Sequence, residues 1–328
     1  MPEDGPFISF AQNAEDVVLW RALSGVSRGR YVEVGANDPT SSSITRAFYD
    51  RGWTGLEIEP VTAFVDAYRE QRPADTVVQA AVTDDGADSV VIHVVDGTGL
   101  STLDGSIMDR HRDSGWTAHE EVVPARRLDD VLEENLSPDE PIHFLVVDVE
   151  GSEGAVLRSV DLLRWRPWVL VVEATAPNST EQTHGEWEPR VLEAGYEFCL
   201  FDGLSRFYVA AEHADELRVD LSAPANPLDR FVTHDSSRAA ESLSRSKAEL
   251  TALRSRHAEV LQDLIRWRGS VLARWTEASR AGGDGHPGAR THEVVRLQEE
   301  LAAIRETVSW RVTSPLRTVQ KRRLQGRS

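Results

Sequence analysis

Residues 31–59, YVEVGANDPTSSSITRAFYDRGWTGLEIE, contain two short β-rich runs with a helical pattern between them. The runs at 31–35 and 54–58 have the composition of strands, and the apolar residues between them recur at helical spacing. Ser42 or Ser43 can cap this helix. A strand, a helix and another strand in this order predict an α/β fold with a mostly parallel sheet and helices on its faces.

The same alternation continues as far as residue 211. It predicts five further strands, at 76–82, 142–148, 168–173, 196–201 and 206–211. The last two strands form a closing hairpin, FCLFDGLSRFYVAA, with Asp202 and Gly203 in its turn. Residues 90–95 lie between two glycines and could add another strand or a hairpin arm.

The composition limits the class of protein. Of 328 residues, 40% are hydrophobic and 27% are charged, which is typical of a soluble globular chain and excludes wholesale disorder. Cys199 is the only cysteine, so no intrachain disulfide can form, and the first residues lack the pattern of a secretory signal. No apolar run approaches the roughly 20 residues that span a bilayer. We therefore expect a cytoplasmic protein that does not cross a membrane.

The net charge of −18 hides two parts of opposite sign. Residues 1–232 carry 18 Lys and Arg against 43 Asp and Glu, whereas residues 233–328 carry 18 against 11. An acidic body would repel phosphate, so no nucleic-acid partner is expected. Between Arg305 and Arg327 the basic residues are interleaved with Trp310 and other apolar residues, which favours docking on a membrane surface or in an enzyme complex. An exposed basic helix end is the simpler alternative.

Beyond Phe231 a seven-residue repeat replaces the α/β pattern. Its a and d positions are Leu243, Leu250, His257, Leu264 and Val271, and Ser246, Leu253, Val260 and Trp267. The repeat predicts a coiled coil, through which the chain could form a homodimer, or one amphipathic helix folded back on the body. The expected segments are a domain at 1–232, a linker at 233–240, a helical segment at 241–281, a hinge at 282–290 and a second helical segment with a basic tail at 291–328.

The carboxyl ends of the first two strands suggest a ligand site, because open parallel sheets bind ligands at that edge. The first strand runs into Gly35, where a ligand can approach the backbone closely, and the next ends in Glu57 and Glu59. A glycine turn followed by an acid about one βα unit later suits an adenosine-type ligand, whose ribose diol a carboxylate can hold.

A second group of acids follows the strands at 142–148 and 168–173. Asp148 ends the first of these apolar runs, Glu150 and Glu153 flank a glycine, and Glu173 ends the second run. Adjacent strands would bring Asp148 and Glu173 to one cleft, where clustered carboxylates indicate a bound cation or a transferable proton. For Glu153, stabilisation of the following helix N-terminus is an equally good explanation.

Four segments resemble the FkbM family of S-adenosylmethionine-dependent methyltransferases over roughly residues 7–232: SFAQNAEDVVLWRAL, YVEVGANDPTSSSITRAFYDRGWTGLEIEP, VVDVEGSEGAVL and GYEFCLFDGLSRFYVA. The resemblance implies a class I methyltransferase fold, with a seven-stranded, mostly parallel sheet, a closing hairpin and an S-adenosylmethionine cofactor. In this chain a coiled-coil tail follows. Ser205 departs from the family pattern, in which many relatives have Asn, so the resemblance transfers substrate contacts at this turn less well.

The resemblance also assigns residues to the cofactor. These are Glu33, Gly35, Ala36, Asn37, Ser43 and Glu59. Glu59 would hold the ribose, with Glu57 as a neighbour in the strand, and Ser43 would help present backbone N–H groups to the methionine carboxylate. Gln12 could lie over the cofactor or act as part of a helix cap.

An acceptor hydroxyl must lose its proton, and a placed carboxylate supplies about 10²–10⁴-fold as general base. The candidates are Asp148, Glu150 and Glu173, with His184 as a further one. No metal ligand is assigned, although the same carboxylates could hold Mg²⁺ on a substrate diol. We expect methylation of a sugar hydroxyl of a glycan, polysaccharide or glycolipid precursor. The alternatives are a natural-product O-methyltransferase and a non-catalytic scaffold that recruits glycan-modifying enzymes.

Overall fold

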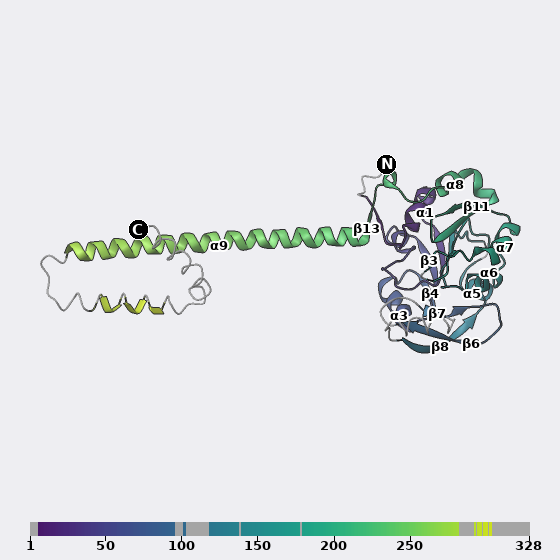
Figure 1. Cartoon of the computed structure of the whole chain (residues 1–328), viewed down its shortest axis with the longest axis horizontal. Coiled ribbons are helices and arrows are strands. Elements are labelled where there is room, and N and C mark those ends of the chain that lie inside the picture. Colours follow the sequence, from purple (N-terminus) through teal and green to yellow (C-terminus); the bar gives the residue numbers. More distant parts are fainter. Residues whose placement is uncertain are drawn as a thin grey trace. The chain divides into compact units, whose positions relative to one another are not determined.

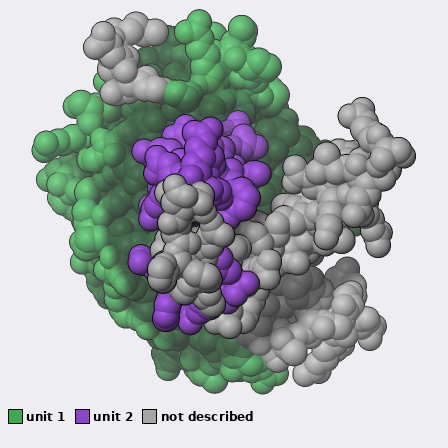
Figure 2. Space-filling view, turned by 90° about the vertical axis from the view of Figure 1, so that its left-hand side faces the viewer, with its two compact units in different colours: residues 1–242 green, residues 243–328 purple. Residues whose placement is uncertain are grey.

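The computed structural model describes residues 6–95, 101–102, 118–137, 139–177 and 179–281, and all but three of residues 292–303. The three are residues 293, 297 and 301. The chain divides into two compact units, Met1–Ser242 and Leu243–Ser328, which Figure 2 distinguishes by colour.

Seven strands form the central sheet of the first unit (Figure 1). Their spatial order is β11 (Tyr196–Phe201), β12 (Ser205–Ala210), β10 (Val169–Glu173), β9 (Phe144–Val147), β2 (Arg30–Val34), β3 (Thr54–Ile58) and β4 (Thr76–Val78). All are parallel except β12, which runs antiparallel to both of its neighbours. The predicted mostly parallel sheet with a closing hairpin is therefore confirmed.

Alternating side chains of the strands point to the two faces of the sheet and form two cores. On one face Val32, Leu56 and Leu145 pack with helices α5 (Leu128–Asn135), α6 (Glu153–Arg158) and α7 (Glu188–Glu193). On the other face Tyr31 and Phe144 pack with helices α1 (Glu15–Leu23), α2 (Arg46–Tyr49) and α8 (Ala214–Leu221). Since both faces are covered, β9 and most of β10 are continuous apolar runs, and this is why the sequence shows these strands clearly.

A second sheet of four strands holds the residues that follow β4. Its order is β5 (Ala81–Val82), β8 (Ala118–Arg126), β6 (Ser89–Val95) and β7 (Ser101–Thr102). The prediction of one strand at 76–82 is wrong, because the chain leaves the central sheet at Gln79, whose side-chain N–H groups donate to Pro60 O and Thr62 Oγ1. The expected strand at 90–95 is present as the core of β6.

The remaining elements connect these layers. They are β1 (Phe7–Ser9), α3 (Thr62–Gln71), the short 3₁₀ helices His184–Glu186, Ala211–His213 and Pro227–Asp229, and β13 (Phe231–Thr233). Strand β13 pairs in parallel with β1, so the segment before the long C-terminal helix is joined to the start of the chain. The sequence patterns did not predict this pair, because each strand has only three residues.

Helix α9 (His234–Ala281) contains 48 residues. The predicted linker at 233–240 is wrong, because Thr233 ends β13 and the next residues, HDSSRAA, contain neither Gly nor Pro and continue as helix. The described residues between 292 and 303 are helical, whereas the expected hinge at 282–290 and the basic tail at 304–328 lie outside the described residues. Within the described part of the chain, no helix is long and apolar enough to cross a bilayer.

Candidate active site

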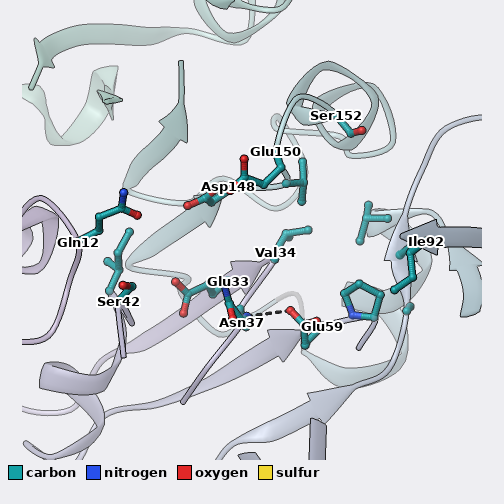
Figure 3. A pocket seen from close by; sticks show the side chains of 18 residues that line it. Gln12, Glu33, Val34, Asn37, Ser42, Glu59, Ile92, Asp148, Glu150 and Ser152 are labelled. Atoms are coloured by element: carbon teal, nitrogen blue, oxygen red, sulfur yellow. Dashed lines mark hydrogen bonds between the residues drawn. The ribbon is translucent and has the colours of Figure 1, made fainter. Parts of the chain in front are cut away.

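A cavity opens at the carboxyl ends of β2, β3 and β9, on either side of the point where the strand order reverses (Figure 3). It contains about 930 Å³ of empty space, with the open solvent at its mouth included. The residues that line it are Gln12, Glu33, Val34, Gly35, Ala36, Asn37, Ser42, Ile44, Glu59, Pro60, Ala80, Ala81, Val82, Ile92, Asp148, Val149, Glu150 and Ser152.

The loop after β2 is held against two neighbouring strands. Gly35 has a φ of +84°, and a Cβ atom there would lie 1.7 Å from the carbonyl oxygen of Asp148, so no other residue fits. The amide of Gly35 donates to Ile58 O at 2.9 Å, and the carbonyl of Ala36 accepts from the Tyr68 hydroxyl at 2.9 Å. This loop is therefore positioned before any ligand enters.

Glu59 connects this loop to the start of α3. One carboxylate oxygen accepts from the amide of Asn37 and the other from the amide of Val61, each at 2.8 Å (Figure 3). Burial raises the pKa of Glu59 to about 7, and the two amide donors counteract this rise. The carboxylate is held at the cavity wall and keeps acceptor capacity for a diol.

Behind the loop lies a buried polar network around Arg72. Its guanidinium group is fully buried and lies 2.5 Å from Glu57 Oε1 and 2.8 Å from Asp75 Oδ2. Thr45 Oγ1 lies 2.7 Å from Glu33 Oε2 and 2.9 Å from Glu57 Oε1. Burial and the charge of Glu57 raise the pKa of Glu33 well above its ordinary value. The network stabilises the ends of β2 and β3 from the face opposite α5 and α6.

Ser43 belongs to this network and does not line the cavity. Its side chain is 1% exposed, and its oxygen accepts from Arg72 at 3.2 Å. Its neighbour Ser42, with a φ of 58°, lines the cavity instead. Glu57 is likewise fully buried and is not a lining residue.

Four acids gather at the ends of β9 and β10. Burial raises the pKa of Asp148, and a hydrogen bond from Glu173 counteracts the rise. Burial and the charge of Asp148 raise the pKa of Glu173 well above its ordinary value. Their hydrogen bond raises the pKa of Glu173 and lowers that of Asp148, so Glu173 is the member of the pair that holds a proton more firmly. Asp148 lines the cavity, whereas Glu173 does not.

The two remaining acids differ in role. Glu150 has a φ of 52°, an uncommon conformation for a residue other than Gly, and faces the cavity. Burial, followed by the charges of Asp148 and Glu153, raises its pKa to about 7. Glu153 is 2% exposed and accepts from the amides of Gly151 and Val149, at 2.9 and 3.3 Å. Glu153 thus stabilises the turn into α6.

Seven of the nine assigned residues line the one cavity, and these are Glu33, Gly35, Ala36, Asn37, Glu59, Asp148 and Glu150. Sequence patterns did not indicate the apolar wall formed by Val82 and Ile92, because it comes from the second sheet. His184 lies 3.7 Å from Glu188 and is also absent from the lining. Across the described ranges, no three His, Cys, Asp or Glu side chains are arranged to hold a metal ion.

A second, wider groove of about 1130 Å³ adjoins the cavity and shares Gln12 and Ser42 with it. Most of its wall is polar, with side chains from β1, the loop after β2, and the first turns of α9. The lining residues are Ser9, Phe10, Ala11, Gln12, Asp38, Thr40, Ser41, Ser42, Gln71, Thr233, His234, Asp235 and Arg238. The ring of Phe10 stacks on that of His234, with centroids 4.5 Å apart.

The sequence matches the methyltransferase FkbM domain over residues 33–198, about half of the chain. None of the curated proteins is significantly similar to it in sequence.

Two solved structures with a similar fold are methyltransferases. One is a TehB-like SAM-dependent methyltransferase from Corynebacterium glutamicum, with 10% identity and a TM-score of 0.33, where the match covers 59% of this chain and 87% of that one. The other is magnesium protoporphyrin IX methyltransferase from Synechocystis with bound SAM, with 9% identity, a TM-score of 0.34, and coverage of 60% and 77%. Similarities at this level give no information on the substrate of this chain. The match to the family domain does define the enzyme class, and the chain belongs to the FkbM family of S-adenosylmethionine-dependent methyltransferases.

Proposed function

We propose that this enzyme transfers a methyl group to a sugar hydroxyl of a glycan, polysaccharide or glycolipid precursor, with Asp148 as general base. The observation that carries the proposal is the pair of Asp148 and Glu173. In this proposal Glu173 holds the proton that the two acids share, and Asp148, which lines the cavity, acts as the carboxylate. A carboxylate in this position can accept the proton of a hydroxyl, which a hydroxyl acceptor must lose.

The residues of the cavity fit S-adenosylmethionine. Val82 and Ile92 offer an apolar wall for an adenine ring, and Glu59 lines the same cavity with a carboxylate suited to a ribose diol. The loop of Gly35, Ala36 and Asn37 forms the adjoining wall, where the backbone can approach the methionine part of the molecule closely. Bound S-adenosylmethionine supplies an electrophilic methyl group on a positively charged sulfur.

The reaction then requires alignment and one proton transfer. Asp148 would accept the proton of the acceptor hydroxyl, and the oxygen of that hydroxyl would take the methyl group that S-adenosylmethionine supplies, which would leave the sulfur neutral. Holding these atoms in line is expected to supply most of the rate. Glu173 acts through Asp148, as a positioning residue that keeps the carboxylate oriented and ionised.

The charges around the site favour a neutral, polyhydroxylated acceptor. Every charged side chain that lines the cavity is an acid, so an anionic acceptor would be repelled. The adjoining groove offers hydroxyl, amide and carboxylate groups, the guanidinium group of Arg238 and the ring of Phe10, which are contacts that a sugar makes through its hydroxyls and its apolar face. We place the acceptor in this groove, with its reacting hydroxyl between Gln12 and Asp148, which lie on the same side of the cavity in Figure 3.

Transfer of a labelled methyl group tests the proposal. The full chain is incubated with methyl-labelled S-adenosylmethionine and fractionated glycan and glycolipid extracts, and the label is located by mass spectrometry after hydrolysis. We expect the label as an O-methyl sugar. Label found only on a protein, a nucleic acid or an aglycone small molecule would contradict the proposal.

The role of Asp148 has a matched control in Glu173. Asp148→Asn removes the base and should lower turnover by about 10²–10⁴-fold with cofactor affinity retained. Glu173→Gln keeps a hydrogen-bond donor to Asp148 and should retain most of the turnover. Equal losses in the two variants, or full turnover of Asp148→Asn, would exclude Asp148 as the base.

A cytoplasmic location with peripheral attachment is part of the proposal. It is supported by the absence of a membrane-spanning helix among the described residues and by the seven Lys and Arg against one acid from Arg305 to Arg327. The full chain should sediment with vesicles that contain anionic lipid at low salt, and removal of residues 305–328 should abolish this. Sedimentation that survives the truncation would refute the role of the tail.

A further inference from the structure

Helix α9 carries a stripe of exposed apolar side chains. Leu243, Leu250, Leu253, Val260 and Leu264 are between 47% and 64% exposed, and no described residue covers them. A contiguous apolar stripe on a helix exposed to water is unfavourable, and it marks an interaction surface.

The stripe follows a heptad repeat. With Leu243 at position a, the a and d positions as far as Val271 are apolar in seven of nine cases, and the exceptions are Ser246 and His257. A repeat of this kind over three or more heptads is the pattern of helices that pair along a seam. Towards its end, Trp267, Val271 and Trp275 line a cavity together with Val294 and Gln298, so the uncovered part of the seam ends near Leu264.

We propose that the partner of this seam is a second copy of the chain, and that the two α9 helices form a parallel, in-register coiled coil over residues 243–268. The charges that flank the seam specify the partner. In a parallel pair, position g faces position e of the following heptad in the other helix. Glu249 then faces the partner's Arg254, and Asp263 faces the partner's Arg268, which gives four ion pairs by symmetry. The other g positions, Ser242, Arg256 and Ser270, face no residue of like charge.

The same charges disfavour the other arrangements. In an antiparallel pair the e positions face one another, and these include Lys247, Arg254 and Arg268, all basic. A parallel pair shifted by one heptad would bring Arg256 opposite the partner's Arg268 and, on the other flank, Arg254 opposite the partner's Arg256. Both alternatives place like charges together, which the in-register pair avoids.

The mass of the full chain in solution gives the first test, because one chain is 36.4 kDa. Light scattering after size exclusion should give twice this value, and Leu250→Asp with Leu253→Asp should give the single value. The double variant should keep its affinity for S-adenosylmethionine, which shows that the first unit is still folded. A monomeric or a trimeric wild-type chain would overturn the proposal.

Cross-linking tests the orientation and the register. In a Cys199→Ser background, which removes the only native cysteine, Leu253→Cys at a d position should form an intermolecular disulfide under mild oxidation. Ser255→Cys at the outward f position is the matched control and should stay reduced. A dimer in which Leu253→Cys does not cross-link, or cross-links no more than Ser255→Cys, would refute the parallel in-register pairing.

A charge exchange tests the ion pairs. Glu249→Arg places like charges opposite each other twice in the dimer, so it should raise the dissociation constant of the dimer by about tenfold. Arg254→Glu should have a similar effect, and the double exchange should restore the wild-type constant within about twofold. Additive losses in the double variant would show that Glu249 and Arg254 do not face each other across the seam.

Discussion

Replacement of Gly35 by Ala tests whether the loop after β2 is built against β9. A Cβ atom at Gly35 would lie 1.7 Å from the carbonyl oxygen of Asp148, whereas real Cβ contacts stay above about 3.0 Å. The two segments must therefore separate by about 1.3 Å. That movement strains two hydrogen bonds, from the amide of Gly35 to Ile58 O at 2.9 Å and from the amide of Asp148 to Val34 O at 3.0 Å.

Gly52 is a matched control for this substitution. Its φ is also +84°, but a Cβ atom there would meet nothing within 4 Å. Gly52→Ala should thus lose about 1 kcal/mol of unfolding free energy for the backbone conformation alone. Gly35→Ala should lose the same amount plus about 2–5 kcal/mol from overpacking and weakened hydrogen bonds.

Urea unfolding of the full chain, followed by tryptophan fluorescence, measures both losses. Calorimetry should show that Gly35→Ala also weakens S-adenosylmethionine binding by tenfold or more, while Gly52→Ala leaves it unchanged. Equal losses of stability in the two variants would refute the close approach of the loop to Asp148.

Two further predictions concern buried charges. Arg72→Met leaves Glu57 buried without its counter-charge and should lower the unfolding free energy by about 3–5 kcal/mol. The side chain of Arg69 is 59% exposed, so Arg69→Met should change the unfolding free energy by less than about 0.5 kcal/mol. Equal effects of the two variants in urea unfolding would contradict the role of the network. The pKa of Glu150 is raised from 4.5 to about 7, so the folded chain holds a proton that the unfolded chain releases between these values. Its contribution to stability is therefore lost as the pH rises from 4.5 through 7. Melting temperatures of Glu150→Gln should fall less steeply over this window than those of the wild type, and identical slopes would refute the shift.

The central sheet could be predicted because its strands are buried on both faces. The run at β9, and that at β10 as far as Glu173, are continuously apolar, whereas β2 and β3 are β-rich runs that each contain one buried glutamate. The end of β4 could not be predicted, since residues 76–82 form one unbroken β-rich run. The side chain of Gln79, bonded to Pro60 and Thr62, marks the break, and these contacts exist only in the folded chain.

The candidate site could be predicted where a residue is fixed by its own strand end. Gly35, Glu59 and Asp148 follow directly from β2, β3 and β9, so the common edge of a parallel sheet brings them together. Ser43 shows the limit of this prediction. In the run SSS at residues 41–43, Ser42 lines the cavity and Ser43 is buried, and the sequence does not distinguish these two neighbouring serines.

Arg72 was not predicted either. Its charge suggests an exposed side chain, and its burial depends on Glu57 and Asp75, which the fold brings to it.

Titration of S-adenosylmethionine into the full chain and its Glu59→Gln variant tests the central claim most directly. We expect binding of one cofactor per wild-type chain, and an affinity about tenfold to a hundredfold lower for Glu59→Gln, because the charged acceptor for the ribose diol is lost. Asp148→Asn should bind the cofactor with nearly wild-type affinity. Absence of binding to the wild-type chain, or equal affinity in Glu59→Gln, would contradict the placement of the cofactor at the ends of β2 and β3.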